Sequence, residues 1–191
     1  LWGTLLFTSW SVGESLARET GAQKLAGVDA LFHFRASTLT FASSALYGYA
    51  YGFIALGGTA LLLRFRLYYF NGTTSISGYV STIAVYLPFL VPFLTALTTA
   101  LMAEIPYRLF FNAFIYQKTH LRTLAVVVSA ALFAVTGSVF TYYPFVLNPL
   151  YLELLLLFVL GLFFGALFWK YDLLTVLVAN FVFFGVLQAI P

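Results

Sequence analysis

The sequence predicts an all-α protein, a polytopic bundle of transmembrane helices. Of its 191 residues, 62% are hydrophobic and 8% are charged, whereas a soluble domain carries about 25% charged residues. Apolar runs long enough to cross a bilayer recur along the chain. The run "LELLLLFVLGLFFGALFW", which begins at Leu152, is one example.

Charge and residue usage argue against several other classes of protein. The net charge is +3, an excess too small to indicate a nucleic-acid partner. The chain has no cysteine, which excludes disulfides and thiolate metal sites. Neither His33 nor His120 falls in the predicted core, so no metal site is expected. No cofactor is predicted, although the aromatic content of 20% leaves contacts with lipid or pigment open.

The first forty residues divide into an apolar and a polar stretch. Residues 1–10 lack the basic start and the small-residue cleavage site of a signal peptide, and we interpret them as the end of a truncated hydrophobic segment. Residues 11–40 mix charged and apolar side chains, and Glu14 and Arg18 have the i,i+4 spacing that supports a helix. We expect an amphipathic segment at the membrane surface or over the bundle. A mixed-charge loop is the alternative.

Residues 41–191 are predicted to form the transmembrane bundle. Phe41–Leu63 is the first span, and a loop follows from Arg64 to Gly78. The apolar stretch Tyr79–Gln117 would measure roughly 58 Å as one helix, about twice a bilayer core. We therefore expect two segments with a turn at Leu94–Leu101. The remaining predicted spans are Leu121–Tyr142, Leu150–Trp169 and Leu173–Ile190.

The basic residues predict an orientation in the membrane. If every predicted segment crosses, the connections near Thr98 and at residues 142–149 lie on one side and carry no Lys or Arg. The opposite side is expected to be cytoplasmic because cytoplasmic loops are enriched in basic residues. That side would hold Arg64, Arg66, Lys118, Arg122 and Lys170.

The stretch "MAEIPYRLFFNAF" places charge inside a predicted span. Glu104 and Arg108 lie four residues apart, so they share a helix face and can form an ion pair. A charge in hydrocarbon costs about 2.5–3.5 kcal/mol, so such residues are usually functional or paired. Both interpretations of Glu104 stay open at this point. Asn112 continues the same face, and Asn180, alone in the last span, is expected to be an interhelical hydrogen-bond donor.

The order of three motifs resembles the CPBP family. The motifs are "AEIPYRLFFNAF", "SAALFAVTG" and "LLFVLGLFFGALFWKYDLLTVLVANFVFF". The CPBP family comprises the CAAX-processing and bacteriocin-processing proteins, also called Abi, and includes glutamic-type intramembrane proteases. The resemblance covers about residues 97–187 and implies a CPBP-like bundle in the C-terminal half.

The first family motif lacks one of its two glutamates in this sequence. In the family, two adjacent glutamates are followed after three residues by an arginine. The second glutamate corresponds to Glu104 and the arginine to Arg108. The first glutamate, which activates the attacking water in the family, corresponds to Ala103, which has no group that accepts a proton.

The other two family motifs have also lost their chemical side chains. The second motif is a phenylalanine followed after three residues by a histidine, and Phe133 is followed by Gly137 in that place. The third is a histidine followed after three residues by Asn or Asp, and those positions hold Asn180 and Phe184. Asn180 still donates a hydrogen bond but does not titrate.

These losses predict a protein without protease activity, and no catalytic residue is expected. We interpret Glu104 and Arg108 as a structural ion pair, and Asn112 and Asn180 as polar core residues. The predicted role is a structural or scaffolding subunit of a membrane complex, with the lipid bilayer and other membrane subunits as partners. One alternative is a residual protease with Glu104 as the base and Asn180 as the oxyanion donor. The other is a transporter component with a polar path along Glu104, Arg108 and Asn112.

Overall fold

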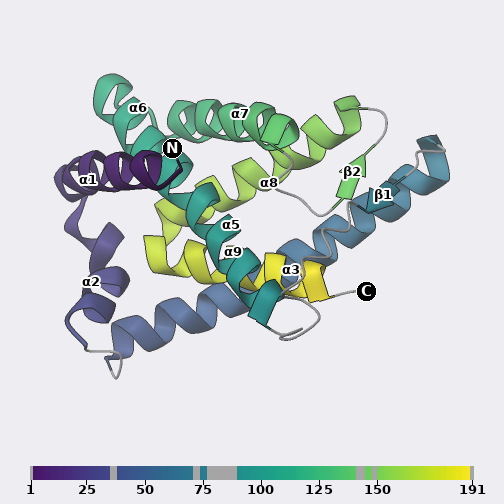
Figure 1. Cartoon of the computed structure of the whole chain (residues 1–191). Coiled ribbons are helices and arrows are strands. Elements are labelled where there is room, and N and C mark those ends of the chain that lie inside the picture. The colour runs from purple at the N-terminus through teal and green to yellow at the C-terminus, as the bar shows by residue number, and fades with distance from the viewer. Residues whose placement is uncertain are drawn as a thin grey trace.

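The structure is a computed structural model that describes residues 2–34, 38–70, 74–76, 90–140, 145–147 and 150–189. These residues form a helical bundle with one short antiparallel ladder (Figure 1). The helices are α1 (Trp2–Thr20), the 3-10 helix η1 (Ala22–Leu25), α2 (Ala26–Phe32), α3 (Leu39–Phe70), α5 (Leu90–Glu104), the π-helix η2 (Ile105–Phe111), α6 (Asn112–Thr119), α7 (Arg122–Phe140), α8 (Leu150–Lys170) and α9 (Leu173–Ala189). The ladder pairs β1 (Thr74–Ile76) with β2 (Phe145–Leu147).

The helices have the length and composition of a multi-pass membrane protein. Within the described residues, four stretches are long and apolar enough to cross a bilayer, and α9 is a shorter apolar helix. The prediction of a helical, multi-pass membrane protein is thereby confirmed. The four stretches are Leu39–Tyr69, Leu90–Thr119, Arg122–Val139 and Leu150–Lys170.

The predicted turn at Leu94–Leu101 is wrong, because α5, η2 and α6 follow one another as a single span of 30 residues. The part of the predicted first segment before Leu90 lies outside the described residues. Threonine is tolerated here because its hydroxyl bonds within the helix: Thr95 donates to the carbonyl of Val91 at 2.6 Å. Pro92 lies in the first turn, where a helix needs no N–H donor. At about 45 Å, such a helix tilts or extends beyond the bilayer core.

The predicted loop after Leu63 begins too early. Helix α3 continues through Arg64 and Arg66 to Phe70. Between Leu63 and Asn71 the sequence contains no Gly or Pro, so nothing there stops the helix sooner. The chain from Arg64 to Phe70 is therefore part of a 32-residue helix.

The basic residues do not share one side, which corrects the predicted orientation. Arg66 and Leu152, in the first turn of α8, line the same groove. The Arg122 guanidinium instead lies 5.5 Å from the ring centre of Trp169, at the opposite end of α8. The shared side was predicted by counting crossings through a turn at Leu94–Leu101, and α5 continues through that stretch as a helix. Arg64 and Arg66 lie at one end, and Lys118, Arg122 and Lys170 at the other.

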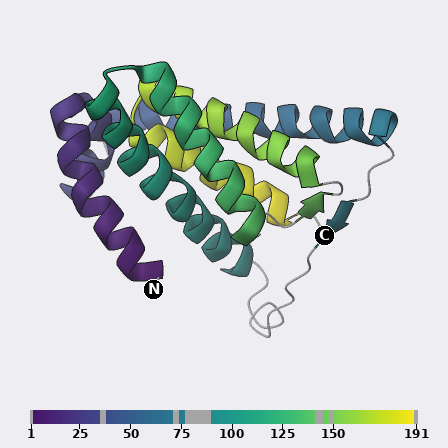
Figure 2. The same cartoon turned by 90° about the horizontal axis from the view of Figure 1, so that it is seen from above.

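The N-terminal segment packs over the bundle. Helix α1 runs unbroken across the boundary predicted at residue 10, and η1 and α2 complete the segment. The polar stretch is therefore helical over residues 11–20 and 22–32, and residues 35–37 lie outside the described residues. Figure 2 shows α1 running beside η2 and α6. The approach is close at Gly13, where an added Cβ would lie 3.0 Å from Cγ of Leu109 in η2.

Close helix packing in the core depends on glycine. A Cβ at Gly48 in α3 would lie 2.6 Å from the carbonyl oxygen of Thr175 in α9, and one at Gly52 would meet the next turn of α9 at 2.8 Å. Helices α7 and α8 meet in the same way, because a Cβ at Gly161 would lie 2.9 Å from Cα of Ala130. Small residues permit such contacts between membrane helices. The rest of the core is largely aromatic and includes the fully buried Phe133, Phe164, Phe168, Phe183 and Phe184.

Candidate functional site

The stretch "MAEIPYRLFFNAF" contains a π-helix. Pro106 has no N–H, and its ring would collide with the carbonyl four residues earlier in a regular α-helix. The backbone widens over Ile105–Phe111, and the N–H of Asn112 donates to the carbonyl of Tyr107, five residues back. Single π-helical turns of this kind frequently occur at functional sites. Glu104 precedes this turn and Arg108 lies within it.

Glu104 contacts one residue of its own helix and one of α9. Its Oε1 accepts a hydrogen bond from Nδ2 of Asn180. Its Oε2 lies 3.6 Å from Nε of Arg108, within ion-pair distance but longer than a hydrogen bond. All three side chains are 0% exposed, so the charges are enclosed by protein.

Arg108 extends the cluster to α7. Its Nη1 donates to Oγ of Ser129 at 3.2 Å, and Ser129 in turn donates to the carbonyl of Tyr107 at 2.9 Å. The guanidinium also lies over the ring of Phe133, 5.0 Å from its centre. We call Glu104, Arg108, Ser129 and Asn180 the Glu104 cluster. Its members come from α5, η2, α7 and α9.

A second contact joins η2 to α7 about two helical turns further along α7. The hydroxyl of Tyr107 lies 2.5 Å from Oγ1 of Thr136, and Thr136 donates to the carbonyl of Leu132 at 2.7 Å. Since the Thr136 proton is engaged with Leu132, Tyr107 is the donor in their bond. The π-helix is thus held against α7 at both of its polar side chains.

Asn112 was expected on the same face as Glu104 and Arg108, and it is likewise 0% exposed. Neither its amide oxygen nor its amide nitrogen has a hydrogen-bond partner among the described residues. The amide oxygen of Asn180 also has no hydrogen-bond partner among the described residues. The structure therefore brings Glu104, Arg108 and Asn180 together but leaves Asn112 outside their hydrogen bonds.

Three positions that hold chemical side chains in the resembled family, Ala103, Gly137 and Phe184, are apolar and buried here. Ala103 is 2% exposed and Phe184 is 0% exposed. A Cβ at Gly137 would already lie 3.3 Å from Cδ1 of Leu157, so a histidine would require the Leu157 side chain to move. The described residues also contain no group of three His, Asp or Glu that could hold a metal ion.

A second buried carboxylate, Asp172, joins three helices at the end of α8. Its Oδ1 accepts from the backbone N–H of Thr175 at 3.0 Å and from the Thr175 hydroxyl at 2.5 Å, which makes Asp172 the N-cap of α9. Its Oδ2 accepts from the N–H of Gly27 in α2 at 3.2 Å and from Oγ of Ser44 in α3 at 2.9 Å. Asp172 thus fastens the N-terminal segment to the bundle.

Lys24, a basic residue of η1, strengthens this attachment to the bundle. Nζ of Lys24 donates to the carbonyls of Phe168, Trp169 and Tyr171 at 2.5–3.1 Å, and so satisfies the free C-terminal carbonyls of α8. Burial lowers the pKa of Lys24, and the nearby Arg122 guanidinium lowers it further.

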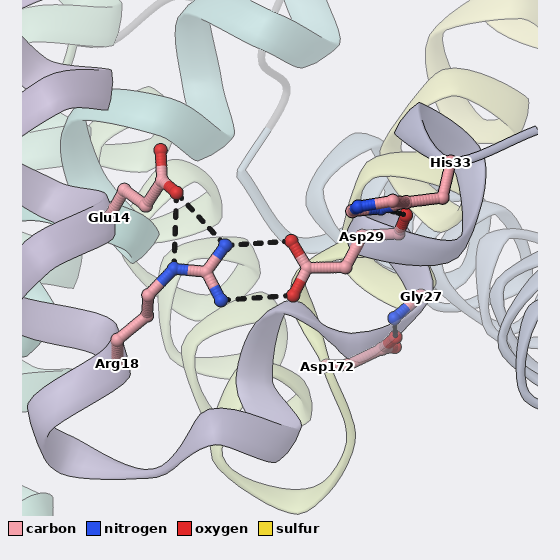
Figure 3. A network of polar contacts seen from close by, with 6 residues as sticks. All are labelled: Glu14, Arg18, Gly27, Asp29, His33 and Asp172. Carbon is pink, nitrogen blue, oxygen red and sulfur yellow. Dashed lines mark hydrogen bonds and ion pairs between the residues drawn. The ribbon is translucent and has the colours of Figure 1, made fainter.

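Arg18 clamps α1 to α2. It donates to Glu14 at 2.9 Å and to both oxygens of Asp29, at 2.7 and 3.0 Å (Figure 3). This bidentate bond lowers the pKa of the Asp29 carboxyl and raises that of the guanidinium. Figure 3 also shows Gly27 and Asp172 at the same junction.

Sequence reasoning did not identify Ser129, Asp172 or Lys24. Asp172 carried a signal, since "DLLT" places an N-capping residue three positions before Thr175 at a helix start. Ser129 and Lys24 carried none, because their partners depend on how distant segments pack. Comparisons of the chain with family models, with curated proteins and with solved structures find no match.

Proposed function

We propose that this chain is a catalytically inactive, CPBP-like integral membrane protein that acts as a structural or scaffolding subunit of a membrane complex. The observation that carries the proposal is the enclosure of the Glu104 cluster. Glu104 and Arg108 are 0% exposed, and their polar atoms contact Asn180 on α9 and Ser129 on α7. A general base has to reach the proton that it removes. A fully buried carboxylate that accepts a hydrogen bond from another helix and faces a counter-charge instead holds helices together.

The surroundings of Glu104 support inactivity in a second way. Ala103, Gly137 and Phe184 carry no group that could take up, deliver or bind a proton. A residual protease would need Asn180 as a donor for a substrate oxygen. Asn180 already donates to Glu104, so its amide group is not directed at a substrate.

A transporter component is the second candidate. It is favoured by Asn112, whose buried amide has no hydrogen-bond partner among the described residues. Buried polar groups usually have partners, so an unpaired amide beside a charged cluster is compatible with a polar path. A proton-flux assay in liposomes, comparing the protein with Asn112→Leu, tests this candidate.

Two experiments separate these functions. Purification from native membranes in a mild detergent should yield a stable stoichiometric partner if the chain is a subunit. Reconstitution with membrane-tethered peptides should yield no cleavage, either by the unaltered protein or by Glu104→Gln. Cleavage that disappears in Glu104→Gln would overturn the proposal in favour of a residual protease.

A further inference from the structure

The second half of α3 projects from the bundle. Figure 1 shows this end of the helix extending toward β1, away from α1 and α2. Its side chains are widely exposed: Leu61 by 71%, Phe65 by 54% and Tyr68 by 81%. Between this half of α3 and the first half of α8 lies a groove with a volume of about 230 Å³.

The groove is apolar and opens outward. Its rim residues Leu62, Leu155 and Val159 are 42%, 56% and 41% exposed. Both flanking helices belong to the stretches that are long and apolar enough to cross a membrane. The mouth of the groove therefore faces the acyl chains of the bilayer, and an apolar cavity of this kind excludes water. Its lining includes Leu62, Leu63, Phe65, Leu152, Leu155 and Val159.

Charge lies at one end of the groove. Arg66 belongs to the lining and is 4% exposed, although the neighbouring side chains of α3 are open. Leu152 marks the charged end, and Val159 lies about 10 Å deeper along α8. Exposed Arg64 lies on a shallow hollow next to the groove and makes no hydrogen bond or ion pair with a described residue. Tyr68 lines the same hollow, at the level where aromatic residues meet lipid headgroups.

We propose that this groove binds one anionic phospholipid, with an acyl chain between α3 and α8 and the phosphate at the exposed Arg64. Polarity and direction agree with this occupant: the cationic end of the groove lies at the end of the bundle, and its apolar end extends toward the middle of the bundle. Glu153, an acidic residue in the first turn of α8, is buried and does not line the groove. A second copy of the chain would need a complementary acidic group to face Arg64, and the lipid phosphate supplies one.

Native mass spectrometry of the full chain in detergent tests the proposal. The delipidated protein is titrated with dioleoyl-phosphatidylglycerol, and separately with dioleoyl-phosphatidylcholine, which has the same chains. We expect one phosphatidylglycerol to bind per chain, with about fivefold tighter binding than phosphatidylcholine, the ratio expected from roughly 1 kcal/mol per basic residue. Arg64→Gln should remove this preference.

Two tryptophan variants separate the groove from the remaining lipid-facing surface. Leu155→Trp fills the groove from an exposed position and should abolish retention of both lipids. Val127→Trp, at a 45% exposed position on α7, should leave both unchanged. Equal binding of the two lipids by the unaltered protein, or undiminished binding by Leu155→Trp, would overturn the proposal. A dimer that Leu155→Trp dissociates would also overturn it and assign the groove to a second copy.

Discussion

Asn180 on α9 donates a hydrogen bond to Glu104 on α5, across 76 residues of sequence. Glu104 also faces Arg108, which donates to Ser129 on α7. One enclosed cluster therefore connects three helices of the bundle. Burying charge is unfavourable unless the partners are well placed, and removing one partner leaves the other without compensation.

Ser129→Ala should lower the free energy of unfolding by about 1–3 kcal/mol, because it removes the acceptor of Arg108 and the donor to the Tyr107 carbonyl. Denaturant titration in mixed micelles measures this. Ser138→Ala on the same helix is the matched control, since among the described residues Ser138 bonds only to the carbonyl of Val135 in its own helix. Equal effects of the two variants would contradict the role of Ser129.

Gly48→Ala should destabilise the contact between α3 and α9, because its Cβ would lie 2.6 Å from the Thr175 carbonyl oxygen. We expect a loss of about 1–3 kcal/mol, as for other overpacked sites. Gly57→Ala on the same helix meets no atom within 4 Å and should be neutral or stabilising. Thermal unfolding of both variants decides the point, and a loss at Gly57 as large as at Gly48 would contradict it.

Asp172→Ala should cost about 2–3 kcal/mol, since it removes the N-cap of α9 and leaves the donors of Gly27 and Ser44 unpaired. Asp172→Asn keeps one acceptor oxygen and should cost less. Hydrogen exchange should show faster opening of α2 as well as of the start of α9. Protection of α2 that is unchanged in Asp172→Ala would show that the N-terminal segment is held in another way.

The clamp between Arg18 and Asp29 should weaken in acid. Since the folded pKa of Asp29 lies below its ordinary value of 3.8, the bond stabilises α2 above that pH and is lost as the pH falls through the folded pKa. Both side chains are partly exposed, so the contribution should stay below about 1 kcal/mol. Hydrogen exchange of α2 from pH 5 to pH 2 measures it. Arg18→Gln should remove this pH dependence, and an unchanged profile would contradict the clamp.

The sequence was most informative where a rule is local. Apolar run length predicted the helices, and the i,i+4 spacing placed Glu104 opposite Arg108. It misled at Leu94–Leu101, where threonines suggested a turn although their hydroxyls bond within the helix. That error also misplaced Arg64 and Arg66, because the count of membrane crossings depends on every turn.

Contacts between distant segments were not predictable from local pattern. Ser129 follows three valines without any distinguishing signal, and only the packing of η2 on α7 brings it to Arg108. Lys24 likewise reads as one charge in a polar stretch, yet it caps α8 more than 140 residues away. Such partners are fixed by tertiary packing, which no periodicity in the sequence records.

The central claim is that Glu104 and Arg108 are a structural pair, and the free energies of unfolding of Glu104→Ala and of the double variant Glu104→Ala/Arg108→Met test it most directly. The single variant leaves Arg108 buried without its counter-charge and should cost about 3–5 kcal/mol. The double variant removes both charges, so we expect it to be more stable than the single variant. A double variant no more stable than Glu104→Ala would contradict the account.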